Sequence, residues 1–408
     1  MVKSGIKLPL YLDHQATTPV DAEVFARMAP YFTEKFGNAS SRVHEFGWTA
    51  EAAVELAREQ VAALVGSTPR ELVFTGGATE SNNLAILGVA QTWIEAGRVP
   101  HFVTTAVEHR AVLEPLLELE RKGCGLTVLP VDKHGRVTPE QVKAALRPDT
   151  ALVSVMLANN EVGSLQPVAE IGRVCKAAGV TFHTDAAQAG AWIKLSVDAL
   201  GVDLLTLSAH KMYGPKGVGA LFIRRRDPRV TLKPLAFGGG QERGLRPGTL
   251  NVPAIVGMGA AAELALSRRE ADAKRIAILR DRVWKGICAG LERVHLNGHS
   301  TERLPGNLNV SFEGVPSEAF LMAARDLAAG SGAACASGSG LPSHVLAAMG
   351  LEESVVRSSI RFGLGREMTD QEADYLVKRA VEVVQDLRQL AQGMDKGESG
   401  LRPEGVRS

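Results

Sequence analysis

Lys211 stands where a lysine could act through its amine. It follows the apolar run 202–207 and begins a glycine-containing turn, with Ser208 and His210 just before it. An amine beside hydroxyl and imidazole donors suits a Schiff base next to a bound anion. The alternative is a surface lysine that closes a strand, which is the commoner role for a lone lysine in a turn. Other residues must therefore support the chemical interpretation.

Asp185 offers a second chemical group. It ends the β-rich run 180–185, so we expect it at the carboxyl end of a strand, where α/β sheets place their chemistry. A carboxylate there can keep a pyridine nitrogen protonated, and Gln188 can reach the phenolic oxygen of the same ring. Pyridoxal phosphate is the cofactor that needs such an acid together with a lysine amine and a phosphate site. The alternative, that Asp185 caps a following helix, stays open.

Residues 72–83 could hold the phosphate. They read as a strand, the pair Gly76-Gly77 and the start of a helix. Backbone N–H groups at such a helix N-terminus bind phosphate. The segment is neither a nucleotide P-loop nor the three-glycine dinucleotide fingerprint. The alternative is that Thr79 is an ordinary helix cap.

Two further polar segments follow apolar strands. His109 comes after 102–104, and 159–163 comes after 151–155. A single histidine is usually a structural residue. A succession of five strand ends with polar side chains is harder to explain by packing, and these side chains are Thr79, His109, Asn160, Asp185 and Lys211. We expect one site along that edge of a sheet.

Strand and helix patterns alternate from residue 45 to 225. This alternation predicts a mostly parallel sheet with helices on both faces, which is an α/β architecture. Within it we expect helices at 49–64 and 139–146 and a strand at 72–75.

The last third of the chain has a different pattern. A helical pattern at 253–291 precedes short strands at 308–312 and 360–362 and a final helix from 370 to about 390. We interpret it as a smaller α+β domain that the N-terminal segment completes. The expected division is a large α/β domain at 15–258, a small domain made of 1–14 and 259–390, and a disordered tail at 391–408.

Composition limits the classes of function. The 408 residues exceed the size at which single cores usually stop growing, so two domains are expected. With 46 basic and 45 acidic residues, the net charge of +1 gives no electrostatic case for nucleic-acid or membrane binding. The four cysteines show no metal-site spacing and favour a reducing compartment. No apolar run suits a signal peptide or a membrane span, so we expect a cytoplasmic protein.

Taken in order along the chain, these motifs resemble a known family. The chain resembles a fold-type-I pyridoxal-phosphate enzyme of the class V aminotransferase group, and specifically a cysteine desulfurase of the NifS and IscS type. The resemblance extends from about residue 10 to residue 390. Its motifs lie at 11–19, 36–41, 77–83, 108–109, 159–163, 185–188, 208–217, 238–249, 335 and 358–362.

The resemblance implies a role for each residue within these motifs. Lys211 would bind the cofactor covalently, Asp185 would pair with the pyridine nitrogen, and His109 would stack on the ring and exchange protons. Asn160 and Gln188 would lie near the phenolic oxygen. The phosphate would be held by Ala78, Thr79, Ser208, His210 and, from the second subunit of a homodimer, Thr249.

Substrate and sulfur roles follow from the same resemblance. Arg361 would bind the substrate carboxylate, with Asn38 close by. Cys335, in the glycine-rich and therefore presumed mobile segment 328–342, would take sulfur from L-cysteine as a persulfide and leave L-alanine. The sulfur would pass to an acceptor or scaffold protein for iron–sulfur clusters or other sulfur-containing cofactors or tRNA. No resident metal is implied, although Cys335 is a candidate transient iron–sulfur ligand.

Two alternatives remain. One is a selenocysteine lyase or another class V enzyme. The presence of Cys335, and the 22 residues that separate it from Ser358, favour the NifS and IscS type instead. The other alternative is a non-catalytic sulfur-assembly scaffold, against which the intact Lys211, Asp185 and His109 argue.

Overall fold

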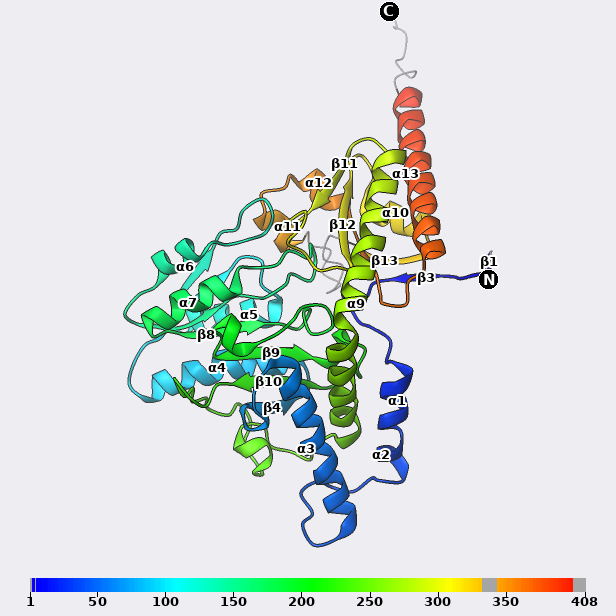
Figure 1. Ribbon diagram of the computed structural model, residues 1–408. Coiled ribbons are helices and arrows are strands. Elements are labelled where there is room, and N and C mark those ends of the chain that lie inside the picture. The colour runs from blue at the N-terminus through cyan, green and yellow to red at the C-terminus, as the bar shows by residue number, and fades with distance from the viewer. Residues whose placement is uncertain (1, 4, 332–342, 399–408) are drawn as a thin grey trace, which may run out of the picture. The chain divides into compact units, whose positions relative to one another are not determined.

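The computed structural model describes residues 2–3, 5–331 and 343–398, and its contacts divide the chain into two units (Figure 1). The first unit comprises Met1–Asp13, Arg275–Asn297 and Gly306–Ser408, and the second comprises His14–Lys274 and Gly298–Pro305. The expected boundary at residue 258 falls inside helix α9 (Val252–Gly290), whose residues belong to both units.

The second unit is built on a seven-stranded sheet in the order β4-β10-β9-β8-β7-β5-β6. Its strands are β4 (Leu72–Thr75), β5 (His101–Thr105), β6 (Gly125–Leu129), β7 (Thr150–Ser154), β8 (Thr181–Asp185), β9 (Leu204–Ser208) and β10 (Gly219–Ile223). Only β10 runs against its neighbours, β4 and β9, so the prediction of a mostly parallel sheet is confirmed. The carboxyl ends of β4, β5, β7, β8 and β9 therefore share one edge.

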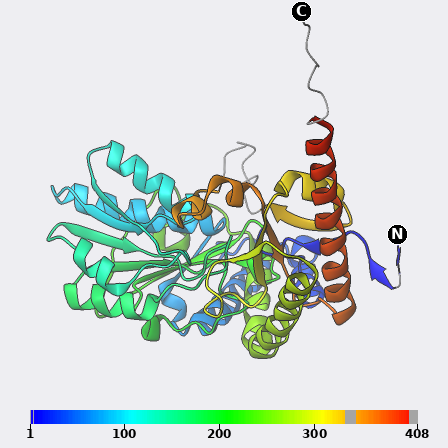
Figure 2. The ribbon, with the colours of Figure 1, turned by 90° about the horizontal axis from the view of Figure 1, so that it is seen from above.

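Helices cover both faces of this sheet, as the fully buried strands β5, β7 and β9 require. In Figure 2, the cyan helices α4 and α5 lie on one side of the strands and the green helix α7 lies on the other. The helices of the unit are α1 (Ala22–Met28), α2 (Pro30–Thr33), α3 (Glu45–Val65), α4 (Ala78–Glu95), α5 (Arg110–Arg121), α6 (Pro139–Ala145), α7 (Val168–Ala178) and α8 (Val197–Leu200), with the start of α9. Phe102, Leu152 and Leu204 of the strands pack with Leu84 and Leu116 of the helices in one buried core.

The first unit has a five-stranded sheet in the order β11-β12-β14-β13-β3. Its strands are β11 (Val294–Asn297), β12 (Asn307–Phe312), β13 (Leu327–Ser331), β14 (Ser359–Gly363) and β3 (Leu10–Leu12), and a separate pair is formed by β1 (Val2–Lys3) and β2 (Ile6–Lys7). The N-terminal strand β3 pairs parallel to β13, and the other pairings are antiparallel. Phe312 and Phe320 stack at the core of this unit.

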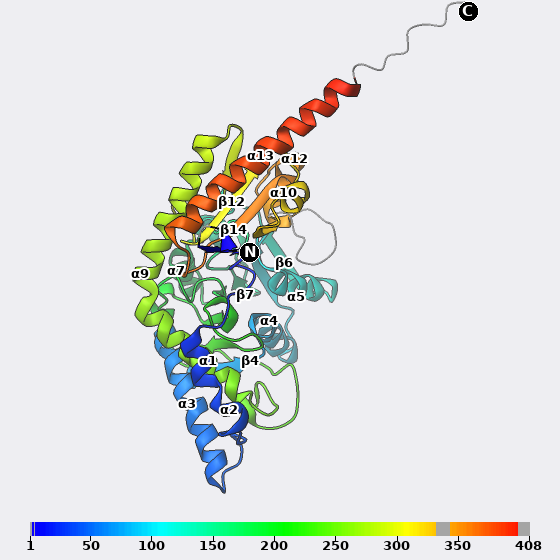
Figure 3. The same cartoon turned by 90° about the vertical axis from the view of Figure 1, so that its right-hand side faces the viewer.

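The end of α9 and the helices α10 (Ser317–Ala323), α11 (His344–Ala348), α12 (Glu353–Arg357) and α13 (Asp370–Glu398) complete the first unit. Figure 3 shows α13 as one long continuous helix. The prediction of a disordered tail from residue 391 is therefore wrong for 391–398, which continue α13, while 399–408 lie outside the described residues. No helix in the described part of the chain combines the length and the apolar character that crossing a bilayer requires.

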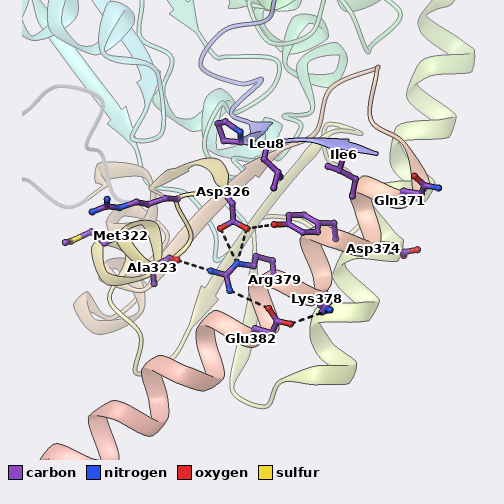
Figure 4. A pocket seen from close by; sticks show the side chains of 13 residues that line it. Ile6, Leu8, Met322, Ala323, Asp326, Gln371, Asp374, Lys378, Arg379 and Glu382 are labelled. Atoms are coloured by element: carbon purple, nitrogen blue, oxygen red, sulfur yellow. Dashed lines mark hydrogen bonds and ion pairs between the residues drawn. The ribbon is translucent and has the colours of Figure 1, made fainter. Parts of the chain in front are cut away.

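A cavity of about 1360 Å³ in the first unit lies beside the N-terminal segment, α10 and α13 (Figure 4). At its base the Asp326 carboxylate accepts hydrogen bonds from the Tyr375 hydroxyl and from Arg379. Burial and the bond to Asp326 raise the pKa of Tyr375 to about 12, so its hydroxyl stays a donor at neutral pH. Arg379 also donates to the carbonyl of Ala323 at 3.1 Å. These contacts fasten α13 to the residues before β13.

Candidate active site

The Lys211 turn is held by the segment 14–18 of the same unit. Lys211 ends a short 3-10 turn that follows β9, and its amine donates to the carbonyl of Gln15 and, at 2.8 Å, to that of Ala16. Gln188, just beyond β8, donates to the same Gln15 carbonyl at 2.9 Å. The structure thus brings two predicted site residues together on one backbone oxygen.

His210 is fixed by the same segment. Its Nδ1 lies 3.1 Å from the hydroxyl of Thr17, while the backbone N–H and hydroxyl of Thr18 donate to the His210 carbonyl at 2.9 and 3.0 Å. Burial, together with the charges of Lys211 and Lys216, lowers the pKa of His210 to about 4. At neutral pH its imidazole is therefore uncharged, with one nitrogen able to donate to an anion.

Asp185 ends β8 and is a buried residue, 6 % exposed. One oxygen accepts the backbone N–H of Ala187 at 2.9 Å, and the other accepts the side-chain amide of Asn82 at 2.7 Å. A turn rather than a helix follows Asp185, so it is not a helix cap. Asn82, which lies in α4, was not predicted from the sequence.

His183 lies two residues before Asp185 on the same face of β8. It is fully buried, and burial lowers its pKa to about 4. Its two ring nitrogens contact the hydroxyls of Ser154 at 2.8 Å and Thr206 at 3.1 Å. These contacts satisfy a neutral imidazole and identify His183 as a structural residue beneath the site.

The predicted phosphate segment forms a tight turn between β4 and α4. Gly77 caps α4 without a side-chain bond, so backbone N–H groups of the first turn remain available. Its φ of 151° is a conformation that residues with a side chain rarely adopt. A Cβ on Gly219 of β10 would lie 2.7 Å from the Gly77 backbone, so these two segments of the backbone approach closely. Ala78 and Thr79 lie within the helix, and Thr79 is therefore not its cap.

The Ser208 hydroxyl adds an unsatisfied donor at the end of β9. Ser208 is buried, and its Oγ has no hydrogen-bond partner among the described residues. Because a buried hydroxyl without a partner is costly, this atom indicates an anion or another polar ligand beside it.

His109 and Asn160 follow the other two strands of the predicted edge. The Nδ1 of His109 accepts the backbone N–H of Ala111 at 3.0 Å, which makes His109 the cap of α5 and orients its ring. Asn160 is half-buried beside the fully buried Asn159. The Asn159 amide donates to the carbonyl of Val107 at 3.0 Å, so the loops after β5 and β7 are joined.

Glu108 strengthens this junction. It is fully buried and accepts the Thr105 hydroxyl at 2.8 Å and the backbone N–H of Met156 at 2.9 Å. Burial and, to a smaller extent, the negative charge of Asp185 raise the pKa of Glu108 to about 8. Glu108 is therefore mainly protonated at neutral pH.

Asn38 and Thr249 are exposed on the second unit. Asn38 accepts the backbone N–H of Ser40 at 2.9 Å. Thr249 ends the loop 238–249, which a buried ion pair ties to the sheet. Glu242 lies in this loop, pairs with Arg58 at 2.7 Å and accepts the backbone N–H of Phe74 at 2.7 Å.

The remaining predicted residues belong to the first unit. Arg361 lies in β14 and donates to Asp13 at 2.7 Å. Gly330 leaves room for this pair, since a Cβ there would lie 3.0 Å from the Asp13 oxygen and 3.1 Å from the Arg361 nitrogen. Cys335 lies outside the described residues.

Comparison with known proteins identifies the family. The family model described as aminotransferase class-V matches residues 10–376. The chain belongs to the aminotransferase class-V family. Among its relatives, a protein named cysteine desulfurase IscS from Anaeromyxobacter sp. (strain Fw109-5) is 54% identical over 386 residues, which cover 95% of each chain. The human protein named cysteine desulfurase is 49% identical over 393 residues, covering 96% of this chain and 85% of that one.

Solved structures agree with this membership of the aminotransferase class-V family. A NifS-like protein superposes with a TM-score of 0.85 at 38% identity, over 92% of this chain and 99% of the other. The structure titled SspA in complex with cysteine gives a TM-score of 0.77 at 37% identity, over 87% and 98% of the two chains. The expected fold-type-I architecture is therefore confirmed.

Pyridoxal phosphate is the cofactor of this class V protein, and the residues present fit it. The uncapped N-terminus of α4 and the unsatisfied hydroxyl of Ser208 suit a phosphate. The buried carboxylate of Asp185 suits a protonated pyridine nitrogen, and the amine of Lys211 suits a covalent bond to the aldehyde carbon.

Proposed function

We propose that this protein is a cysteine desulfurase that converts L-cysteine to L-alanine and carries the sulfur as a persulfide on Cys335. The observation that carries the proposal is the arrangement at the sheet edge, where Lys211 and Gln188 meet at the Gln15 carbonyl and Asp185 ends the neighbouring strand. The named activity of the relatives and the cysteine bound in one structural neighbour support the choice of substrate.

In this proposal the second unit handles the cofactor. When bound, pyridoxal phosphate supplies an electron sink for the charge left as a substrate proton departs. Asp185 keeps a proton on the pyridine nitrogen, and the N-terminus of α4, Ser208 and the neutral His210 hold the phosphate. Lys211 would remove the α-proton of the substrate through its Nζ. His109 would stack on the ring and is a candidate proton donor or acceptor, and Asn160 and Gln188 would hold the phenolic oxygen.

Sulfur transfer is assigned to residues of the first unit. Arg361 binds the substrate carboxylate with a planar guanidinium, together with Asn38. The Cys335 thiolate attacks the substrate sulfur, so that a sulfur–sulfur bond forms as the carbon–sulfur bond breaks. The electron pair of the broken bond stays with the carbon skeleton, which takes up one proton at Cβ, regains one at Cα and leaves as L-alanine. A thiolate is required because a neutral thiol is a poor nucleophile.

We also propose that the protein works as a homodimer in which Thr249 completes the phosphate site of the partner subunit. Apolar side chains on the second unit support this proposal, because the exposed rings of Phe36 and Phe46 lie together with their centroids 5.3 Å apart, and exposed apolar clusters commonly mark interfaces. Phe36 is 64% exposed and Phe237, in the segment before the Thr249 loop, is 87% exposed. Phe32, Phe46 and Trp48 are exposed in the same way.

The remaining proposals concern partners and location. We infer that the sulfur passes to an acceptor or scaffold protein, and the name of the bacterial relatives favours iron–sulfur cluster assembly. A cytoplasmic location is supported by Cys124, Cys175 and Cys288, which form no disulfide within the described chain. The net charge of +1 supports the absence of a nucleic-acid partner.

Purified holoenzyme given L-cysteine or L-selenocysteine tests the activity. We expect L-alanine from L-cysteine and one labile sulfur per active site, located on Cys335 by mass spectrometry. Release of alanine from selenocysteine alone would instead indicate a selenocysteine lyase. A protein that binds no cofactor and releases no alanine would favour the non-catalytic scaffold.

A further inference from the structure

We infer that Asn82 is a positioning residue that fixes the Asp185 carboxylate against the cofactor nitrogen, an inference that rests on the proposed function. Asn82 lies in α4, 103 residues before Asp185, and is 0% exposed. Its side-chain Nδ2 donates to Asp185 Oδ2 at 2.7 Å. The other carboxylate oxygen accepts the backbone N–H of Ala187 at 2.9 Å. Each oxygen therefore has its own donor, and the pair of bonds sets the plane of the carboxylate.

The orientation of the Asn82 amide follows from its surroundings. A carboxylate only accepts hydrogen bonds, so the amide must present its nitrogen to Asp185. The amide oxygen, Oδ1, is then buried without a hydrogen-bond partner in the described chain. Burying a polar atom in this way is unfavourable, and the charge-assisted bond from Nδ2 offsets that cost. The hydrogen bond that the Asn82 nitrogen donates to Asp185 therefore accounts for an asparagine at this position.

The neighbours of Asn82 in α4 have hydrogen-bond partners of a different kind, so the contact of Asn82 is not a general feature of this helix. The Ser81 hydroxyl lies 2.8 Å from that of Thr75, and Asn83 donates to the carbonyl of Thr79 at 2.9 Å. Both contacts stay within α4 and the strand before it. Asn82 alone of these three reaches the end of β8.

The position of Asn82 on α4 links the two ends of the cofactor site. The first turn of α4 supplies the phosphate-binding N–H groups, and Asn82 follows one turn later. One rigid helix therefore sets the separation between the phosphate site and the carboxylate of Asp185. Because a misplaced contact weakens positioning strongly, we expect the loss of this bond to affect turnover more than folding.

The test compares Asn82→Leu with Asp185→Asn and a neighbouring control. Leucine has a similar volume and no donor, and Asn83→Ala removes an adjacent amide that bonds within its own helix. Each holoenzyme is loaded with cofactor labelled with 15N at the pyridine nitrogen. The 15N chemical shift, cofactor dissociation, thermal unfolding, kcat and KM for L-cysteine are measured. Asn82→Ser, which keeps a short donor, is the second variant if Asn82→Leu does not fold.

We expect Asn82→Leu to move the 15N shift toward that of Asp185→Asn and to lower kcat about tenfold to a hundredfold, the range for losing a hydrogen bond to a charged group. In Asn82→Leu, the KM and the thermal unfolding temperature should change little. The 15N shift and kcat of Asn82→Ser should lie between those of the wild type and Asn82→Leu, and those of Asn83→Ala should match the wild type. If the 15N shift is that of the wild type in Asn82→Leu but changed in Asp185→Asn, the inference about Asn82 is overturned and the assignment of Asp185 stands. An unchanged shift in Asp185→Asn overturns the assignment of Asp185 and the inference with it. Normal 15N responses without alanine release would contradict only the proposed function.

Discussion

The amine of Lys211 and the backbone carbonyl oxygen of Gln15 are hydrogen-bond partners although 196 residues separate them in the chain. This bond places the amine at the edge where β8 and β9 end. Because Gln188 uses the same carbonyl, the segment that contains Gln15 organises both side chains. The residues from 14 to 18 are therefore part of the candidate active site.

Replacing Lys211 by Ala should abolish the visible absorbance of lysine-bound cofactor and all release of alanine. The reason is that Lys211 carries the amine assigned to the covalent bond with the cofactor, whereas its bonds to the carbonyls of Gln15 and Ala16 are expected to matter less for the fold. Absorbance spectra and an alanine assay check the result. Lys216→Ala is the matched control, since Lys216 is exposed and five residues away. Retention of the band in Lys211→Ala would move the assignment to Lys216.

Replacing Cys335 by Ser should separate proton transfer from sulfur transfer. A serine hydroxyl stays protonated near neutral pH and cannot accept sulfur as a thiolate does. The variant should still bind L-cysteine and exchange its α-proton with deuterated solvent, but release no alanine. Nuclear magnetic resonance of the recovered cysteine measures the exchange. Alanine production near the wild-type rate would exclude Cys335 as the acceptor.

Mixed dimers should reveal that Thr249 acts across subunits. Thr249→Ala and Lys211→Ala are each expected to be nearly inactive alone. In a dimer with one subunit of each kind, one site combines an intact Lys211 with the partner's intact Thr249. Random pairing of equal amounts should then restore about a quarter of wild-type activity in a symmetric dimer. If mixing after subunit exchange restores nothing, Thr249 serves its own chain.

Replacing Asp326 by Asn should destabilise the first unit in a pH-dependent way. Burial alone would raise the pKa of Asp326, but hydrogen bonds from Tyr375 and Arg379 outweigh it and hold the pKa below its usual value of 3.8. The ionised carboxylate therefore contributes stability above that value and loses it as the pH falls through the lower pKa of the folded state. We expect a loss of about 1–2 kcal/mol at pH 7 for this partly buried site.

Urea unfolding at pH 7, 5 and 4 measures the difference in the free energy of unfolding between the wild type and Asp326→Asn. This difference should stay constant from pH 7 to 5 and begin to decrease toward pH 4. Glu114→Gln is the control, because the exposed pair of Arg110 and Glu114 on α5 should contribute no more than about 0.5 kcal/mol. A difference that grows on acidification would contradict the role given to the charge of Asp326.

Much of the sheet edge could be predicted because its signals are local. The strand at 72–75 matches β4, and the helix at 139–146 begins where Thr138 and Gln141 form a capping box. A polar residue after an apolar strand is visible in a few residues of sequence. The parallel order of the strands then brings such residues together.

Features that depend on distant partners were missed for the same reason. The hydrogen bond from Asn82 to Asp185 joins residues 103 positions apart, and no pattern in the sequence around Asn82 predicts it. Helix α3 begins at Glu45 rather than 49, because His44 accepts the N–H of Gly47 as its cap, a role usually taken by shorter polar residues. The end of α13 was placed too early, since its charged residues resemble a tail as much as an exposed helix.

The spatial order of the strands also governs how this site can arise during synthesis. In the described sheet β4 pairs only with β10, and 143 residues lie between Thr75 and Gly219. At about 5–20 residues per second, a ribosome needs roughly 7–30 s to make them. Throughout that interval β4, which leads into the phosphate-binding turn, lacks its native neighbour β10. An unpaired strand edge of this kind can pair with other chains. A nascent chain therefore cannot complete the sheet beside the phosphate-binding turn until β10 has emerged.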